Sequence, residues 1–153
     1  EQSLRIEEEL GNRAGMANTY GQLGVLAHDQ SDHDTARDHY QQALTIFEEL
    51  GNRAGIAKTH HQLGVLAHDQ SDHDTARDHY QQALTIFEEL GNRAGIAKTH
   101  HQLGILAHDQ SDYNTAHTYY QRALTIFENL GDRVNIAKVR RNLDILAQDQ
   151  NDT

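Results

Sequence analysis

Histidine is the residue whose number and spacing first suggest chemistry in this chain of 153 residues. Twelve histidines occur, and most of them recur at a fixed interval along the sequence. Zinc needs imidazole nitrogens at about 2 Å in a tetrahedral arrangement. On a helix, however, His60 and His61 point about 100° apart, and His61 and His68 lie roughly 10 Å apart along the axis. No pair has the i, i+4 spacing of the HExxH motif. We therefore expect no metal or cofactor, and interpret His33, His39, His60 and their copies as filling aromatic-like or surface positions.

The histidines also suggest a response to pH. Protonation of all twelve would move the formal net charge from −10 to about +2, because histidine titrates near ~6.5. The hypothesis is that binding or solubility changes between about pH 7.5 and 5.5.

Two acidic segments, DQSDHD at 29–34 and 69–74, have the look of a cation loop. They lack the glycine turn and the distal glutamate of an EF-hand. Asp32 and Asp72 each precede a predicted helix, so helix capping explains both segments without an ion.

No catalytic arrangement is found. The chain has no cysteine, nucleophile elbow, P-loop or dinucleotide-binding motif. Any Ser-His-Asp set or carboxylate pair would occur in several copies, whereas chemistry usually needs one unique, desolvated site. We expect a protein that is not an enzyme. Its 23 acidic against 13 basic residues also argue against nucleic acid or an anionic membrane as partner.

The sequence starts at Glu1 without an apolar signal segment, and no stretch approaches the ~20 apolar residues of a membrane helix. The expected compartment is therefore the cytoplasm.

A repeated unit must position all these side chains. Residues 11–50 recur at 51–90 with four changes, and residues 91–130 repeat 51–90 with eight. Residues 131–148 restart the unit, and residues 1–10 resemble its tail. We expect one array over 1–153, with units at about 11–50, 51–90 and 91–130, a partial helix B at 1–10 and a final helix A at 131–149.

Each unit carries two helical patterns. In the second unit, apolar residues step by three and four over two segments, which is typical of amphipathic helices. We predict helix A at about 53–69 and helix B at about 73–90, with equivalents in the other units. Gly91 suits the left-handed position after helix B. Four residues can cap the start of helix A: Asn12, Asn52, Asn92 and Asp132.

These residues resemble the tetratricopeptide repeat family. The matching positions are Leu63, Gly64, Ala67, Ala76, Tyr80 and Ala83. The resemblance spans the whole chain, although the period is 40 rather than the usual 34 and the proline after helix B is absent. It implies an all-α, right-handed α-solenoid of stacked helix-turn-helix units, and a scaffold that binds a protein or peptide in the concave groove lined by the A helices.

Both ends depart from the repeat. Asp144 replaces the glycine of helix A, and Glu7 replaces the phenylalanine of Phe47 and Phe87. A carboxylate at a close-approach site indicates an exposed end.

The resemblance implies a groove on one face of helix A. The expected peptide-binding residues are Asn18, Gln22, Val25, Lys58, His61, Gln62, Val65, His68, Lys98, His101, Gln102, Ile105, His108, Lys138, Arg141, Asn142 and Ile145. Three of the four changes between the first two units, including Gly21 to His61, fall near this face. An apolar row beside a basic flank favours an extended acidic peptide with apolar anchors.

Other interpretations stay open. The apolar row can instead pack between neighbouring A helices, with the lysines solvated. In the family's best-understood subclass, Lys, Asn and Arg grip a C-terminal carboxylate. Lys98 matches one of those positions, but Val25, Gln62 and Gln102 occupy the others, so we do not expect a chaperone tail as ligand. The array can also be a head-to-tail homo-oligomer through its solenoid ends, or a fragment or engineered array with no ligand of its own.

Overall fold

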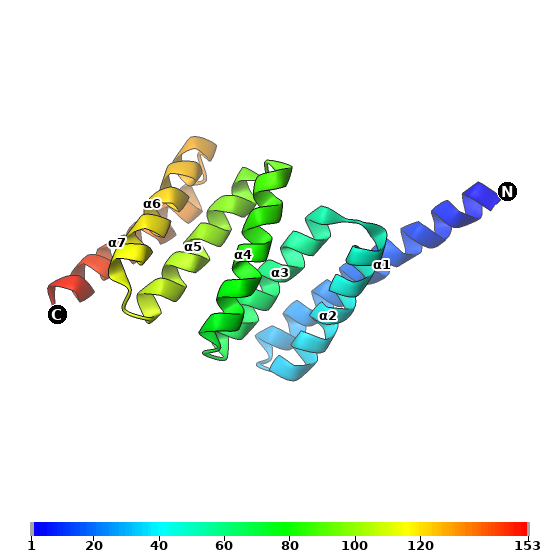
Figure 1. The fold of residues 1–153 in the computed structure, drawn as a ribbon, viewed down its shortest axis with the longest axis horizontal. Helices are drawn as coiled ribbons and strands as arrows, with labels where there is room; N and C mark the ends of the chain where they lie inside the picture. The colour runs from blue at the N-terminus through cyan, green and yellow to red at the C-terminus, as the bar shows by residue number, and fades with distance from the viewer. Residues whose placement is uncertain (1, 153) are drawn as a thin grey trace. The chain divides into compact units, whose positions relative to one another are not determined.

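A computed structural model describes residues 2–152 of the chain, with the side chains of residues 6 and 9–152. This part forms seven α-helices and no strand (Figure 1). Their bounds are α1 Gln2–Asp29, α2 His33–Leu50, α3 Arg53–Asp69, α4 His73–Leu90, α5 Arg93–Asp109, α6 Tyr113–Leu130 and α7 Arg133–Asn151. The all-α class and the tandem helix-turn-helix organisation are confirmed, and α3 and α4 have the predicted bounds. We call the odd-numbered helices the A helices and the even-numbered ones the B helices.

The chain divides within α4 into two compact units, Glu1–His79 and Tyr80–Thr153. Unit 1 holds α1, α2, α3 and the start of α4. Unit 2 holds the rest of α4 with α5, α6 and α7. No helix among the described residues is both long and apolar enough to cross a membrane.

Within each unit, helix A and helix B meet where a glycine faces a tyrosine ring. A Cβ atom built on Gly24 would lie 2.5 Å from the Tyr40 ring, and one built on Gly104 would lie 2.6 Å from the Tyr120 ring. Both tyrosines are almost fully buried. Only glycine allows this approach without moving a packed ring. The core of unit 2 is built around the same contact, from Ala97, Ala107, Ala116, Tyr120, Ala123, Phe127, Val139 and Leu146.

The turn from a B helix to the next A helix follows the predicted chemistry. Gly51 has a φ of 66° and its N–H donates to the carbonyl of Glu48, as a left-handed C′ residue does. Asn52 then accepts from the Gly55 N–H at 2.9 Å and caps α3. Asn92 and Asp132 cap α5 and α7 in the same way.

The turn from helix A to helix B contains a feature that the sequence did not reveal. Ser31, Ser71 and Ser111 adopt a φ of 59–60°, a conformation that non-glycine residues adopt rarely. Each serine precedes the aspartate that caps helix B. Asp32 accepts from the Thr35 N–H at 3.2 Å, so the predicted capping role of this aspartate is confirmed.

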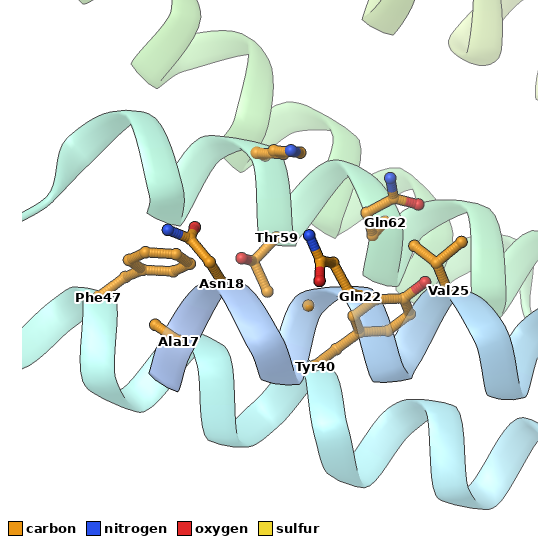
Figure 2. A pocket seen from close by; sticks show the side chains of 10 residues that line it. Ala17, Asn18, Gln22, Val25, Tyr40, Phe47, Thr59 and Gln62 are labelled. Atoms are coloured by element: carbon orange, nitrogen blue, oxygen red, sulfur yellow. The ribbon is translucent and has the colours of Figure 1, made fainter. Parts of the chain in front are cut away.

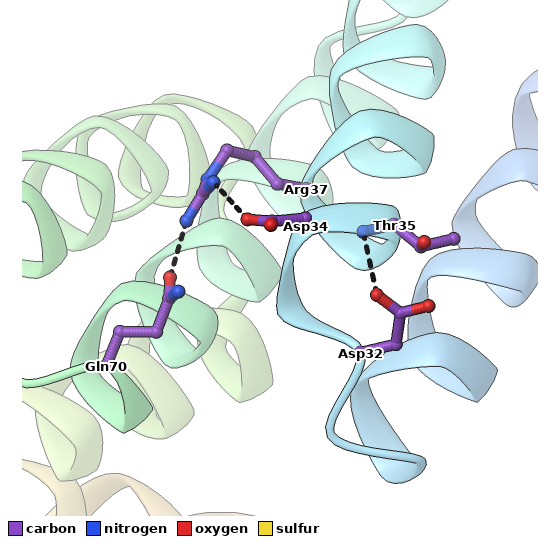
Figure 3. A network of polar contacts seen from close by, with 5 residues as sticks. All are labelled: Asp32, Asp34, Thr35, Arg37 and Gln70. Carbon is purple, nitrogen blue, oxygen red and sulfur yellow. Dashed lines mark hydrogen bonds and ion pairs between the residues drawn. The ribbon is translucent and has the colours of Figure 1, made fainter.

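A hydrogen bond from one arginine connects the start of α2 to the next A helix of unit 1 (Figure 3). Arg37 on α2 donates to Asp34 at 3.2 Å and to the side-chain oxygen of Gln70 at 2.6 Å. Gln70 is the C-cap residue of α3. The contact therefore links the start of one helix to the end of its neighbour.

The predicted break at residues 11–12 is wrong. Helix α1 runs without interruption from Gln2 to Asp29, so Asn12 does not cap a helix and residues 2–10 belong to α1 rather than to a separate helix B. In Figure 1 the first turns of α1 project beyond α2. Leu10 and Met16 are about half exposed, so little packing is present here to compensate for the hydrogen bonds that a turn would break. The prediction for Glu7 lies outside the described side chains, whereas Asp144 is exposed as expected.

Candidate functional site

A cavity of about 370 Å³ opens between the three helices of unit 1. Helix α1 supplies one wall, α2 the floor and α3 the opposite wall. The residues of α1 are Ala17, Asn18, Gly21, Gln22 and Val25; those of α2 are Tyr40 and Phe47; those of α3 are Lys58, Thr59 and Gln62. Figure 2 shows Asn18 and Gln22 pointing from α1 toward α3, where Thr59 and Gln62 lie. We call this space the Gly21 cavity.

Helical periodicity brings the two walls together. Asn18, Gln22 and Val25 are four and three residues apart, so their side chains share one face of α1. Lys58 and Gln62 are four residues apart and share one face of α3. Gly21 lies within the α1 face, and a Cβ atom built on it would meet nothing within 4 Å. The missing side chain at this position therefore leaves the space open.

The floor carries a polar atom without a hydrogen bond. The Tyr40 hydroxyl is buried and has no partner in the structure. Burial, followed by the charge of Asp29, raises the pKa of Tyr40 to about 12. A buried hydroxyl without a partner costs free energy, on the order of 1–3 kcal/mol. A ligand group that reached Tyr40 would recover part of that cost.

The walls combine apolar surface with a few polar groups and carry a single cation. Asn18, Gln22 and Gln62 offer carboxamide groups, each of which can donate and accept hydrogen bonds. The Thr59 hydroxyl is already used, since it donates to the Gly55 carbonyl at 2.8 Å. Lys58 is the one lining residue that is charged at neutral pH. The cavity is thus suited to a polar ligand with an apolar part rather than to a cation.

The third repeat has a ring at the matching position. His101 stands two repeats after Gly21, and it is 9% exposed. Its ring meets Tyr120 edge to face at a centroid distance of 6.0 Å. Asn142 donates to its Nε2 at 2.9 Å. Tyr120 also has hydrogen-bonding neighbours, because its hydroxyl lies 3.4 Å from His108 Nδ1 and it bonds with Asn142.

Within each unit, a histidine–aspartate pair joins consecutive A helices. His28 of α1 lies 2.5 Å from a carboxylate oxygen of Asp69 on α3, and His108 of α5 lies 2.6 Å from one of Asp149 on α7. Each aspartate directly follows the position that repeats its histidine in the next unit. These pairs give His108, a predicted groove residue, a contact within the protein.

A second set of histidines fills the aromatic-like positions predicted for His60. Ring pairs join helix A to helix B in each repeat: Tyr20 with His39 at 5.9 Å, His60 with His79 at 5.3 Å and His100 with Tyr119 at 5.7 Å. His60 and His79 also share a hydrogen bond between their Nδ1 atoms at 3.0 Å.

The buried histidines do not have the ordinary histidine pKa that was assumed for all twelve. Burial, with His79 adding to it, lowers the pKa of His60 to about 4, and burial with Arg122 lowers that of His100 to about 4. Burial also lowers the pKa of His79 and of His101. The expected charge change of twelve between pH 7.5 and 5.5 is therefore too large, because buried imidazoles resist protonation.

The remaining predicted site residues divide by burial. Val65, His61, His68, Gln102, Ile105 and Asn142 are half-buried, while Lys98, Lys138, Arg141 and Ile145 are exposed. Ile105 packs against the core of unit 2, which is the packing alternative considered for the apolar row. Within residues 2–152, no three His, Cys, Asp or Glu side chains gather closely enough to hold a metal ion.

Sequence reasoning did not place Tyr40, Phe47 and Thr59 at this site. The sequence pattern indicates core positions for all three. Tyr40 and Phe47 also come from helix B rather than from the predicted face of helix A. The change from Gly21 to His61 was the signal that could have located the opening.

Solved structures share the fold. BtubC (BKLC) from P. vanneervenii matches with 24% identity and a TM-score of 0.80, over 89% of this chain and 57% of that one. The Rap conjugation gene regulator of the plasmid pLS20, in complex with the Phr* peptide, matches with 19% identity and a TM-score of 0.76, over 86% of this chain and 37% of the regulator. The N-terminal domain of stress-induced protein-1 from C. elegans matches with 21% identity and a TM-score of 0.65, over 84% of this chain and 95% of the domain.

This chain therefore spans less than two thirds of the first two proteins. No curated protein matches its sequence. The family model of the tetratricopeptide repeat matches residues 1–49 and 55–129. Together with the repeated helix pairs and the glycine–tyrosine contacts, this match shows that the chain belongs to the tetratricopeptide repeat family.

Proposed function

We propose that this chain is a scaffold that holds an extended peptide segment along the exposed faces of its A helices. The observation that carries the proposal is the Gly21 cavity, where two A helices present carboxamides above a buried tyrosine hydroxyl without a partner. Pockets that combine apolar walls with a few polar groups are the usual sites for ligands.

The chemistry of the cavity fits a peptide. Carboxamides can pair with both the N–H and the C=O of a peptide backbone, and Phe47 and Val25 supply apolar surface. Lys58 favours acidic side chains in a segment bound to unit 1, and the exposed Lys98, Lys138 and Arg141 favour them in a segment bound to unit 2. The pLS20 regulator, whose structure contains a bound peptide, shares the fold, which supports a binding role for the present chain.

Selection from a displayed random peptide library tests this function. We expect enriched peptides to bind the wild type and to lose affinity at least about tenfold in the double variant Lys58→Glu, Gln62→Ala, which corresponds to about 1.4 kcal/mol. Arg133→Glu is the matched control, because it makes the same charge change at an exposed residue that is neither in the Gly21 cavity nor among the expected groove residues. Failure to enrich any peptide, or equal loss in the control, would contradict the proposed site.

A second candidate is assembly between copies. Leu26 on α1 is 54% exposed, whereas its equivalent Leu66 on α3 is 1% exposed. An apolar helix face of this kind is a common contact surface. Sedimentation from about 5 to 200 µM would separate the candidates, since association that Leu26→Lys abolishes supports assembly. A monomer at all concentrations argues against it.

A further inference from the structure

The Gly21 cavity lies where another copy of the repeat holds an imidazole ring. Gly21 and His101 occupy the same position of the repeated unit, as do Tyr40 and Tyr120. In unit 2 the His101 ring packs edge to face on Tyr120 and is buried. In unit 1 the corresponding tyrosine is buried as deeply, but no side chain projects from residue 21 to cover it.

The hydrogen bonding differs in the same way. Asn142 donates to Nε2 of His101, and Gln62 stands at the equivalent position of the cavity wall. Gln62 has the same carboxamide group as Asn142, on a side chain that is one methylene longer. Tyr120 has hydrogen-bonding partners, whereas the Tyr40 hydroxyl has none. The first copy therefore retains the tyrosine and the amide of this ring site while lacking the ring.

We propose that the Gly21 cavity binds the neutral imidazole ring of a histidine side chain in a peptide ligand. The ring packs against Tyr40, and one of its nitrogens accepts from Gln62 as His101 accepts from Asn142. This inference rests on the proposed peptide-binding function and names an anchor side chain for that site. The volume of about 370 Å³ exceeds that of one five-membered ring and leaves room for adjoining main chain.

The charges around the cavity select the neutral ring. Two titratable side chains line it, Tyr40 from α2 and Lys58 from α3, and none comes from α1. Asp29 of α1 acts on Tyr40 through its charge but does not line the cavity. Lys58 corresponds to Lys138, which together with burial lowers the pKa of His101 in unit 2. A cation entering the cavity would meet the same repulsion from Lys58, so affinity falls as the ligand becomes protonated.

The probe for the test is 4-methylimidazole, which has the atoms of the histidine side chain. It is titrated into the full chain at pH 8.0 while the amide signals of Gly21 and Gln62 are followed by NMR. For a ligand this small, we expect a dissociation constant on the order of millimolar. Toluene serves as a ring without a hydrogen-bonding nitrogen, and the titration is repeated at pH 5.5.

Four variants sharpen the test. Gly21→His supplies the ring from within the chain and should abolish binding, and the repeat tolerates it because His101 stands at the same position. His101→Gly should create a second site in unit 2. Gln62→Leu should weaken binding at least about fivefold by removing the donor. Gly15→Ala is the matched glycine control, since its added Cβ meets nothing within 4 Å and it does not line the cavity.

Each outcome decides the inference. Saturable shifts at Gln62 that are lost in Gly21→His, retained in Gly15→Ala and weaker at pH 5.5 support it. Equal binding of toluene, absence of saturation up to about 50 mM, or unchanged binding in Gly21→His would overturn it. Should His101→Gly fail to fold, the variants in unit 1 still decide.

The peptide selection separates this inference from the proposed function. Peptides that lose affinity through the Lys58 and Gln62 changes but not through Gly21→His would support the scaffold and overturn the histidine anchor. Binding of 4-methylimidazole without any enriched peptide would support the ring site and count against the scaffold.

Discussion

The first and third repeats build the same helix pair around different interiors. Gly24 and Gly104 accept Tyr40 and Tyr120 at nearly equal distances, so the backbone scaffold is common to both. Residue 21 is glycine in one and residue 101 is a buried histidine in the other. The result is a cavity in unit 1 and a packed ring in unit 2. The comparison indicates that the contact between the helices is independent of what fills the adjoining space.

The largest effect is expected where the two repeats agree. Gly24→Ala and Gly104→Ala should each lower the free energy of unfolding by about 3 kcal/mol, because the new methyl would collide with a packed tyrosine ring. Urea unfolding measures both. Gly21→Ala is the control in the same helix, and we expect a gain of about 0.5–1 kcal/mol from helix propensity. A loss in only one repeat would show that the scaffold is not shared.

The next largest effect is expected at residues 21 and 101, which occupy the same position of the repeat and differ in type. His101→Gly should cost about 2 kcal/mol of unfolding free energy, because it removes a buried ring and places glycine inside a helix. The reverse change, Gly21→His, should stabilise by about 1 kcal/mol at pH 8. Guanidinium unfolding of both proteins decides this. Effects of equal sign would refute the interpretation of residue 101 as a filler of the matching space.

A smaller effect is expected on the stability of the folded protein as the pH is lowered. The pKa of His60 and of His100 in the folded protein is about 4, below the ordinary value of about 6.5. The unfolded chain therefore binds more protons between these values, and stability falls as the pH drops from about 6.5 toward 4. Replacing both residues with phenylalanine should reduce the loss in Tm between pH 7 and 4.5 by about 5 °C.

Tyr20 supplies the comparison within the chain, because the first repeat has no histidine at this position of helix A. Tyr20→His should leave the high-pH Tm nearly unchanged and increase its acid dependence. An identical pH profile in wild type and double phenylalanine variant would contradict the burial argument.

The smallest effect concerns a segment that occurs in two conformations. EELGNRAG forms a helix at 8–15 and a turn between helices at 48–55 and 88–95. At the turn of unit 1, the Phe47 ring packs on Gly55, where a Cβ would lie 2.5 Å away. Glu7 stands in place of that phenylalanine. We expect Glu7→Phe to shift the chemical shifts of Gly11 toward those of Gly51, for a gain below about 1 kcal/mol. Unchanged helical shifts at Gly11 would indicate that packing beyond this one side chain controls the turn.

Local pattern determined much of the fold. The repeat period, the bounds of α3 and α4 and the caps at Asn52 and Asp132 were predictable, since helix periodicity and capping depend on residues within a few positions. Several cavity residues on α1 and α3 were also predicted, although as parts of a longer groove. The glycine sites of close approach followed from the family resemblance.

Tertiary structure alone decided the rest. EELGNRAG has identical local preferences in all three copies, and only its packing partners separate helix from turn. Likewise, His60 is an ordinary histidine in the sequence, and burial against His79 keeps it neutral. The cavity beside Gly21 required the distance between two helices and the burial of Tyr40. Such properties depend on contacts across the chain, which the periodic sequence by itself does not specify.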